Sequence, residues 1–195
     1  MIRLTEVVKQ IIIINALVFL AQMTFGNGTF VLHFPANEAF RPYQLLTHMF
    51  MHGGFSHILF NMFSLAMFGP PVESLLGPKK FLFYYLFCGI GAAFLQLFVV
   101  YFQYGYSPEV SYGMLGASGA IFGILAAFGM YFPDVKMQMI FPPVALPAKV
   151  MVVLFGIIEL TMGFGGFSSG IAHFAHVGGA IFGLLLIFYW RKFGR

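Results

Sequence analysis

Apolar residues gather into six long runs along the chain, separated by short stretches rich in charged residues, glycine or proline. A helix needs about 20 apolar residues to cross the hydrocarbon core of a bilayer, and each run comes close to that length. We therefore predict an all-α membrane protein in which one domain, residues 1–195, forms a single bundle of six transmembrane helices. The predicted spans cover residues 9–25, 55–70, 81–103, 116–131, 147–164 and 171–190.

The composition requires lipid as the solvent for most of the surface. Hydrophobic residues make up 60% of the chain, charged residues only 8%, and the mean hydropathy is +0.90. A soluble domain carries about 25% charged residues, so a water-soluble fold is excluded. The basic residues behind the net charge of +4 are spread between the apolar runs, which argues against a nucleic-acid partner. Cys88 is the only cysteine, so no internal disulfide can form.

The distribution of lysine and arginine predicts the orientation in the membrane. With the N-terminus inside, the outer loops hold only Arg41. The inner segments then hold Arg3, Lys9, Lys79, Lys80, Lys136, Lys149, Arg191, Lys192 and Arg195. This split predicts that both termini are cytoplasmic, and we expect a multi-pass integral protein of a bacterial inner (cytoplasmic) membrane. Residues 9–25 are expected to be a retained span, because no small-x-small cleavage site follows them.

Two of the predicted connections are more than simple loops. Residues 26–54 form a long outer segment with many aromatic side chains, which we expect to dip into the membrane interface. Residues 132–147 form an inner connection that is broken by prolines, with Phe141-Pro142 in its middle. Glu73, at the inner end of the second span, is expected to pair locally with Lys79 and Lys80.

The fourth span is too short to cross the whole membrane. Its roughly 16 residues reach about 24 Å, whereas the hydrocarbon core is about 30 Å thick, and residues 104–113 before it are polar and rich in glycine and proline. Non-helical backbone at that depth survives only inside protein or beside a watery cavity. The fourth helix should therefore be central and sheltered, with Ser118 at its start. A lone serine beside glycines is most often a packing or capping residue, so Ser118 needs further support.

That support comes from polar residues on two other helices. Spans two, four and six all run from outside to inside in the predicted topology, and their first turns carry His57 and Asn61, Ser118, and His176 respectively. Polar groups inside a membrane are costly and usually serve a site. A hydroxyl, an imidazole and an amide at similar depth are the groups needed for a nucleophile, a general base and an oxyanion donor.

Three motifs, in this order and on these spans, resemble those of the rhomboid family of intramembrane proteases. They are THMFMHGGFSHILFN over residues 47–61, GASG over 116–119 and AHVGGAIFG over 175–183. The resemblance covers nearly the whole chain. It implies a six-helix rhomboid bundle and an intramembrane serine endopeptidase whose partners are transmembrane protein substrates in the lipid bilayer, without any cofactor.

The resemblance also implies residue roles. Ser118 would be the nucleophile and His176 the general base, with His57, Asn61 and the backbone N–H of Ser118 holding the oxyanion. Glycines would support helix packing, with a contact between Gly119 and Gly183 setting the distance within the Ser–His dyad; the glycines concerned are Gly116, Gly119, Gly179 and Gly183.

The family works without a third carboxylate, and the acidic residues of the outer half have no spacing that demands one; they are Glu38, Glu109 and Glu159. One departure from the family pattern is Tyr43-Gln44, where relatives commonly have Trp-Arg. It leaves open how the loop before the second span is anchored.

Other readings are weaker. His48 and His52, like His173 and His176, have a spacing that metal sites use, but no His-Glu-x-x-His motif accompanies them, so we expect no metal. His48, His52 and His173 are instead expected to form hydrogen bonds within the loop and helix ends. A proton-coupled transporter would explain Glu159, but no inverted repeats are evident. The alternative from another class is a catalytically silent rhomboid-like escort or chaperone that binds transmembrane helices.

Overall fold

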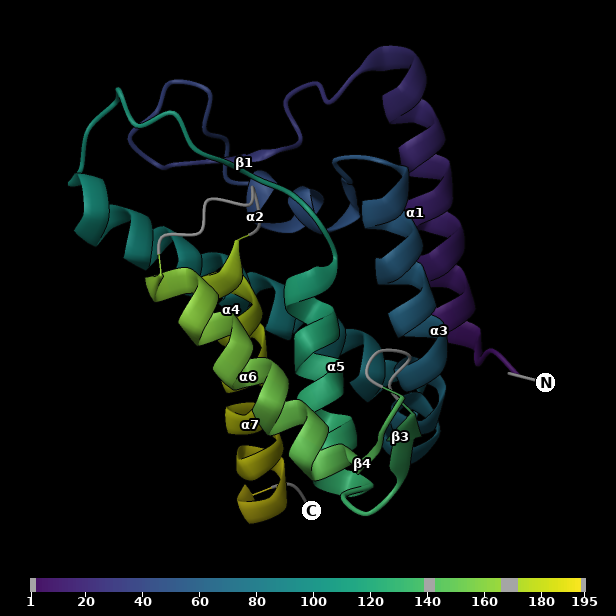
Figure 1. Cartoon of the computed structure of the whole chain (residues 1–195). Coiled ribbons are helices and arrows are strands. Elements are labelled where there is room, and N and C mark those ends of the chain that lie inside the picture. Colours follow the sequence, from purple (N-terminus) through teal and green to yellow (C-terminus); the bar gives the residue numbers. More distant parts are fainter. Residues whose placement is uncertain (1–2, 139–142, 166–171, 194–195) are drawn as a thin grey trace.

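A computed structural model describes residues 3–138, 143–165 and 172–193 of the chain and is mainly helical (Figure 1). Its long helices are α1 (Glu6–Phe25), α3 (Phe55–Leu76), α4 (Pro78–Tyr104), α5 (Ser118–Tyr131), α6 (Ala148–Phe164) and α7 (His173–Phe193). Four of these, α1, α3, α4 and α7, are long and apolar enough to cross a membrane. The predicted helical membrane fold is therefore confirmed. The six-span topology stays a prediction, and residue 171, Arg195 and Phe141-Pro142 lie outside the described residues.

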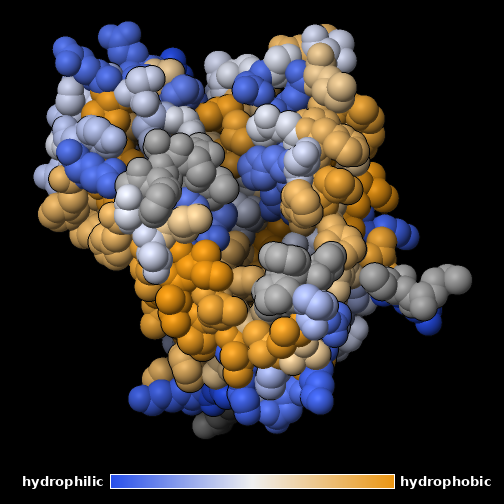
Figure 2. Space-filling view, viewed as in Figure 1, coloured by the Kyte–Doolittle hydropathy of each residue, from blue (hydrophilic) through white to orange (hydrophobic). Residues whose placement is uncertain are grey.

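The surface agrees with a protein embedded in lipid. Figure 2 shows a hydrophobic zone across the middle of the visible face, with hydrophilic residues gathered at the two opposite ends. Side chains along α1 such as Leu17 and Leu20 are about 60% exposed, which is tolerable only where the surrounding solvent is apolar. The molecule is a multi-pass membrane protein.

Glycines end three of the long helices. Gly26, Gly77 and Gly105 have φ angles of 75°, 78° and 71°, a left-handed conformation that costs little only for glycine. The N–H of each bonds to the carbonyl four residues back, which satisfies one of the free carbonyls of the last helical turn. The second predicted span ended at residue 70, yet α3 continues through Pro70 and Pro71 to Leu76. Proline is tolerated within membrane helices because neighbouring groups satisfy the freed backbone.

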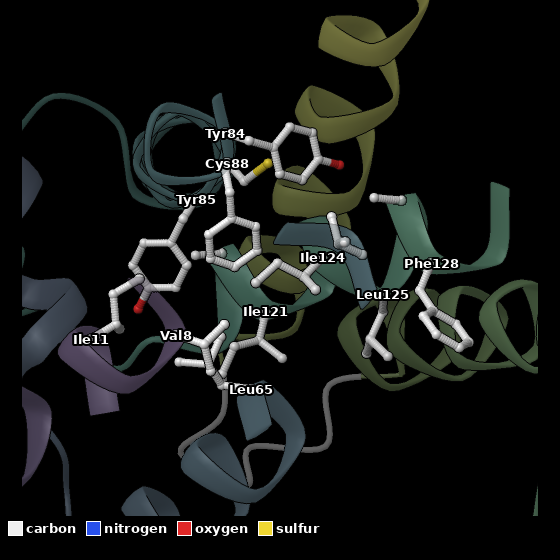
Figure 3. Close-up of a cluster of buried hydrophobic side chains, with 14 of the residues drawn as sticks. Val8, Ile11, Leu65, Tyr84, Tyr85, Cys88, Ile121, Ile124, Leu125 and Phe128 are labelled. Carbon is white, nitrogen blue, oxygen red and sulfur yellow. The ribbon is translucent and has the colours of Figure 1, made fainter. Parts of the chain in front are cut away.

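The short helix α5 occupies the centre of the bundle. Ten of its 14 residues are buried, and it packs against α3, α4, α6 and α7. Figure 3 shows part of the core around it, where Ile121 and Ile124 of α5 meet Tyr84 and Tyr85 of α4. The hydroxyl of Tyr84 donates a 2.7 Å hydrogen bond to the carbonyl of Gly123. At about 21 Å in length, α5 is short, central and sheltered, as the sequence predicts.

Glycine contacts hold α5 against α7, but one turn away from the predicted pair. A Cβ on Gly179 would collide with the backbone of Gly119, so these two residues form the close backbone approach. Gly183 lies instead against the hydroxyl of Tyr84 on α4. The expected Gly119–Gly183 contact is therefore wrong. Both glycines lie on one stripe of α7, and the sequence does not tell which of two positions a turn apart faces α5.

The connection between α1 and α3 is a folded unit. It contains β1 (Leu32–His33), the short helix α2 (Gln44–Thr47) and a 3₁₀ turn, η1 (His48–Phe50). Strand β1 pairs antiparallel with β2 (Gly113–Met114), which ties this unit to the segment before α5. Residues 26–54 thus cover one end of the bundle (Figure 1).

Gln44, at the position where the sequence departs from the expected Trp-Arg, anchors this unit. It is fully buried. Its Oε1 accepts a hydrogen bond from the backbone N–H of His33, and its Nε2 donates to the carbonyls of Thr29 and Ala39. One neutral side chain therefore holds three backbone segments of the loop together. Both polar atoms of the buried glutamine amide are hydrogen-bonded, so the departure from Trp-Arg leaves neither of them without a partner.

The connection between α5 and α6 forms a small hairpin rather than a simple loop. Strands β3 (Lys136–Gln138) and β4 (Ala145–Pro147) pair antiparallel, in the register Lys136 with Pro147 and Gln138 with Ala145. The sequence did not predict this hairpin, because the segment is rich in proline, and proline is depleted in strands except at their ends and edges.

Glu73 has a different partner from the expected one. Its carboxylate accepts hydrogen bonds from the hydroxyl of Thr5 at 2.5 Å and from the backbone N–H groups of Val7 and Val8 at 3.1 and 2.9 Å. The local pairing with Lys79 and Lys80 is therefore wrong. The first N–H groups of a helix have no partner within it and carry partial positive charge, so the start of α1 binds this buried carboxylate from α3.

Candidate active site

A cavity of about 970 Å³ lies over the N-terminal end of α5. Its walls come from α3, α4, α6, α7 and the segment that precedes α5, and it includes His57, Asn61, Ser118 and His176. In Figure 1 the N-terminal ends of α3, α5 and α7 lie toward the same end of the molecule, and Figure 2 shows the visible face hollowed in this region. The residues that the sequence singled out thus line one cavity.

Ser118 is the first residue of α5, and the backbone before it is shaped by Gly116. Gly116 has a φ of 124°, and a Cβ there would lie only 2.8 Å from the ring of His57. Its N–H donates a 2.9 Å hydrogen bond to the carbonyl of His48, which fixes the approach of the chain to the helix. At the start of α5 the Ser118 hydroxyl also lies beside N–H groups that have no partner inside the helix.

His176, the fourth residue of α7, faces Ser118. Its Nε2 lies 2.7 Å from the Oγ of Ser118. The ring of Phe122, one turn further along α5, stacks flat on the imidazole, with centroids 4.4 Å apart and planes within 5°. Gln96 of α4 accepts a 3.0 Å hydrogen bond from the N–H of Ala175 at the start of α7. These contacts orient an imidazole toward a hydroxyl on a different helix.

His57 and Asn61 lie one turn apart on α3, beside the Ser–His pair. The backbone N–H of Gly53 donates to the Nδ1 of His57 at 3.2 Å. A neutral imidazole that accepts at Nδ1 carries its proton on Nε2, and this nitrogen is turned toward Gly116. The amide of Asn61 uses one N–H to bond the carbonyl of His57 at 2.8 Å, which leaves its second N–H available.

Glu159 is a residue of this site that the sequence spacing did not identify. Its Oε2 lies 2.6 Å from the Nδ1 of His173 and 3.0 Å from the Nδ1 of His176. The contact with His173 is a hydrogen bond, whereas the one with His176 is short but bent, so the two groups are at ion-pair distance without a linear hydrogen bond. The available signal was an acidic residue within an apolar helix, which is rare without a partner.

The other histidines differ in their surroundings. The Nδ1 of His48 bonds the carbonyl of Gln44 at 2.8 Å, as expected for a loop histidine. Within the described part of the chain, neither ring nitrogen of His52 has a hydrogen bond of good geometry, although the backbone of Phe50 lies near the ring, so the expected hydrogen bond of His52 stays a prediction. Burial lowers the pKa of His48 to about 4, and burial together with the nearby His57 lowers the pKa of His52 to about 4.

Glu159, His173 and His176 are the one cluster of three potential metal ligands among the described residues. Their distances favour hydrogen bonding over shared coordination. Donor atoms bound to one tetrahedral zinc ion at 2.0–2.1 Å lie about 3.3 Å from one another, whereas Oε2 of Glu159 approaches the two Nδ1 atoms to 2.6 and 3.0 Å.

Comparisons with known proteins agree with the motifs. The Rhomboid domain model matches residues 39–193. The chain is 32% identical over 195 residues to the mitochondrial presenilin-associated rhomboid-like protein of Rattus norvegicus, covering 95% of this chain and 48% of that protein. It is also 32% identical over 148 residues to rhomboid protease AarA of Providencia stuartii, covering 71% and 52% respectively.

A third relative, presenilin-associated rhomboid-like protein A of Danio rerio, is 32% identical over 173 residues, which cover 83% of this chain and 43% of that protein. The chain therefore spans about half the length of the curated relatives it matches. Because the family model covers most of the chain and three motif-bearing helices meet at one cavity, the chain belongs to the rhomboid family.

Proposed function

We propose that this protein is an intramembrane serine endopeptidase that cuts peptide bonds in or near the transmembrane segments of other membrane proteins. The observation that carries the proposal is the 2.7 Å approach of His176 Nε2 to Ser118 Oγ inside the cavity. A packing or capping serine would not need an imidazole from another helix at hydrogen-bond distance. The name of one reported relative supports the same proposal, since that protein is called a rhomboid protease.

In the proposed mechanism, His176 Nε2 takes the hydroxyl proton of Ser118 as the oxygen attacks the substrate carbonyl carbon. The negative charge that develops on the carbonyl oxygen is held by three donors: the Nε2–H of His57, the free N–H of Asn61 and the backbone N–H of Ser118. His176 then gives the proton to the leaving amine. Water attacks the acyl-enzyme, with His176 again serving as the base.

Substrates are proposed to reach the cavity sideways, between α3 and α6. Both helices contribute to its walls, with Phe60 on α3 and Met162 on α6. Among the described residues, α6 packs mainly on α5 and α7, and only Ala148 and Met151 of this helix are buried. A helical substrate shields its peptide bonds, so it has to unwind locally, which favours segments with glycine, proline or polar residues near the cut.

The proposal includes the finer topology. We propose six spans, with α5 and α6 as the fourth and fifth, both termini in the cytoplasm and the cavity toward the outer side. The bacterial inner membrane is the proposed location. The basic residues at the starts of α4 and α6 and at the end of α7, for example Lys79, Lys149 and Arg191, support this orientation.

Labelling with a fluorophosphonate probe tests the proposal. Detergent-solubilised wild type should be labelled covalently and should cleave a model transmembrane substrate, whereas Ser118→Ala and His176→Ala should do neither. A silent escort would bind the substrate without labelling or cleavage. Full cleavage by Ser118→Ala would overturn the assignment of the nucleophile.

A further inference from the structure

The carboxylate of Glu159 is the one acidic group that reaches the Ser–His pair within the described residues. It projects from α6, 17 residues before His176 in the chain, and its Oε2 lies 3.0 Å from the ring nitrogen opposite the one that faces Ser118. The two ring nitrogens of His176 therefore face different side chains: Nε2 lies next to Ser118 Oγ, and Nδ1 lies next to Glu159 Oε2.

We propose that Glu159 is a positioning residue for the Ser118–His176 pair, so that this rhomboid protein uses a Ser–His–Glu arrangement. The inference rests on the proposed protease function. A carboxylate at Nδ1 favours the tautomer with its proton on Nδ1, which leaves Nε2 unprotonated and able to take the proton of Ser118. It also stabilises the imidazolium that forms during the attack. Glu159 itself stays ionised, and no proton moves to it.

The surroundings of Glu159 support such a role. Its neighbours Ile157, Ile158 and Leu160 are about half exposed on the outside of α6, on a surface that faces lipid. A carboxylate within an apolar membrane helix is costly unless it is paired. The side chain of Glu159 is only 15% exposed and turns inward to two histidines of α7. It therefore lies with the cavity and not at the lipid surface.

His173 holds the carboxylate in place. Its Nδ1 lies 2.6 Å from the same Oε2 that approaches His176. A hydrogen bond from a second ring restricts the rotamers of the glutamate and keeps one oxygen next to His176. The bent geometry at His176 agrees with this reading, since catalytic hydrogen bonds are often poorly aligned before substrate binds and tighten in the complex.

The test compares Glu159→Gln and Glu159→Met with wild type in cleavage and in fluorophosphonate labelling. Glutamine keeps the shape and removes the charge, while methionine keeps a similar length without a polar group, and the melting temperature of each variant shows whether it folds. Both should lower kcat and the labelling rate about 10²-fold, with KM and the melting temperature unchanged. Glu159→Asp, which keeps the charge, should recover part of the lost rate. Glu109→Gln removes an exposed acid elsewhere and should behave as wild type.

Four outcomes overturn the inference. Wild-type kcat in Glu159→Gln and Glu159→Met would show that His176 needs no carboxylate, while the protease function itself would stand because Ser118→Ala stays inactive. A loss confined to KM or to stability would make Glu159 a structural residue. Loss of wild-type activity with a chelator and its recovery with zinc would make the cluster a metal site. If wild type neither labels nor cleaves, the proposed function and this inference fail together.

Discussion

At the scale of single residues, the site depends on which nitrogen of each imidazole faces the cavity. Gly53 donates to Nδ1 of His57, so the Nε2–H of this ring is available as a donor toward the cavity. His176 presents the opposite arrangement, with Nε2 at the hydroxyl of Ser118. The two histidines are thus proposed to take different roles, because their neighbours on the other side of each ring differ.

Asn61→Ala is expected to slow cleavage about 10²–10³-fold, because it removes one oxyanion donor. Folding should be unaffected, since the hydrogen bond that the amide makes among the described residues stays within its own helix, to the carbonyl of His57. Steady-state kinetics with a transmembrane substrate measure the effect, which should appear in kcat. Ser64→Ala, which alters the same cavity wall one turn further on, serves as the matched control. Equal rates for both variants would exclude Asn61 as a donor.

The sequence could predict a residue of the candidate site only where that residue belongs to a motif of the family. Ser118, His176, His57 and Asn61 follow from motif and orientation, and the structure brings all four to one cavity. Glu159 could not be found in this way, because its distance from His176 depends on how α6 rotates against α7. The sequence of a membrane helix whose faces are all apolar gives little information about that rotation.

At the scale of helices, the positions of the long elements follow from apolar length, whereas their ends depend on particular contacts. The predicted spans 81–103 and 147–164 agree closely with α4 and α6. The first predicted span began at residue 9, but α1 begins at Glu6 because the carboxylate of Glu73 binds its first N–H groups. A cap supplied by a residue 65 or more positions away leaves no local signal at the helix start.

Glu73→Gln should lower the stability of the protein by about 1–3 kcal/mol, because hydrogen bonds from a helix start to a buried charged acceptor are lost or weakened. Thermal unfolding in detergent, followed by circular dichroism, measures the change. Glu6→Gln removes an exposed charge from the first turn of α1 and should have a much smaller effect. Equal melting temperatures for wild type and Glu73→Gln would show that the carboxylate does not stabilise the start of α1.

The loop between α1 and α3 should make stability depend on pH. The folded pKa of His48 and of His52 is about 4, below the value of 6.5 in the unfolded chain. The unfolded state therefore binds more protons between pH 6.5 and 4, and stability falls as the pH drops through this range, by about 3 kcal/mol for each ring. Above pH 6.5 this loss is absent.

Melting temperatures between pH 4 and 8 measure this dependence. The double variant His48→Asn and His52→Gln should show a flatter curve than wild type, because neither replacement gains a proton in the unfolded chain. His33→Gln, at a partly exposed histidine of β1, should keep the wild-type slope. An unchanged slope in the double variant would place the origin of the acid sensitivity elsewhere.

At the scale of the whole molecule, a short central helix surrounded by longer ones creates a polar cavity inside an apolar body. α5 reaches about 21 Å, less than the hydrocarbon thickness of about 30 Å, so the space beyond its N-terminus is filled by β2, the loop from α1 to α3 and the cavity. On the visible face, hydrophilic residues gather at the two ends of the molecule and hydrophobic ones lie between them (Figure 2). Water can therefore reach Ser118 while the helices stay in lipid.

The six-span orientation can be tested with cysteines, because the only natural one, Cys88, is buried and can be replaced by alanine. Arg41→Cys lies in a predicted outer loop, and Lys79→Cys and Lys149→Cys lie in predicted inner segments; all three native side chains are exposed. In bacterial spheroplasts an impermeant maleimide should label Arg41→Cys at once, and the two lysine variants only after permeabilisation. Membranes keep lysine and arginine on the cytoplasmic side, and Arg41 alone lies on the outer side in this topology. Labelling of Lys79→Cys and Lys149→Cys from opposite sides would mean that α4 and α5 do not both cross. The proposed six-span topology, and with it the proposed approach of substrates between α3 and α6, would then have to be abandoned.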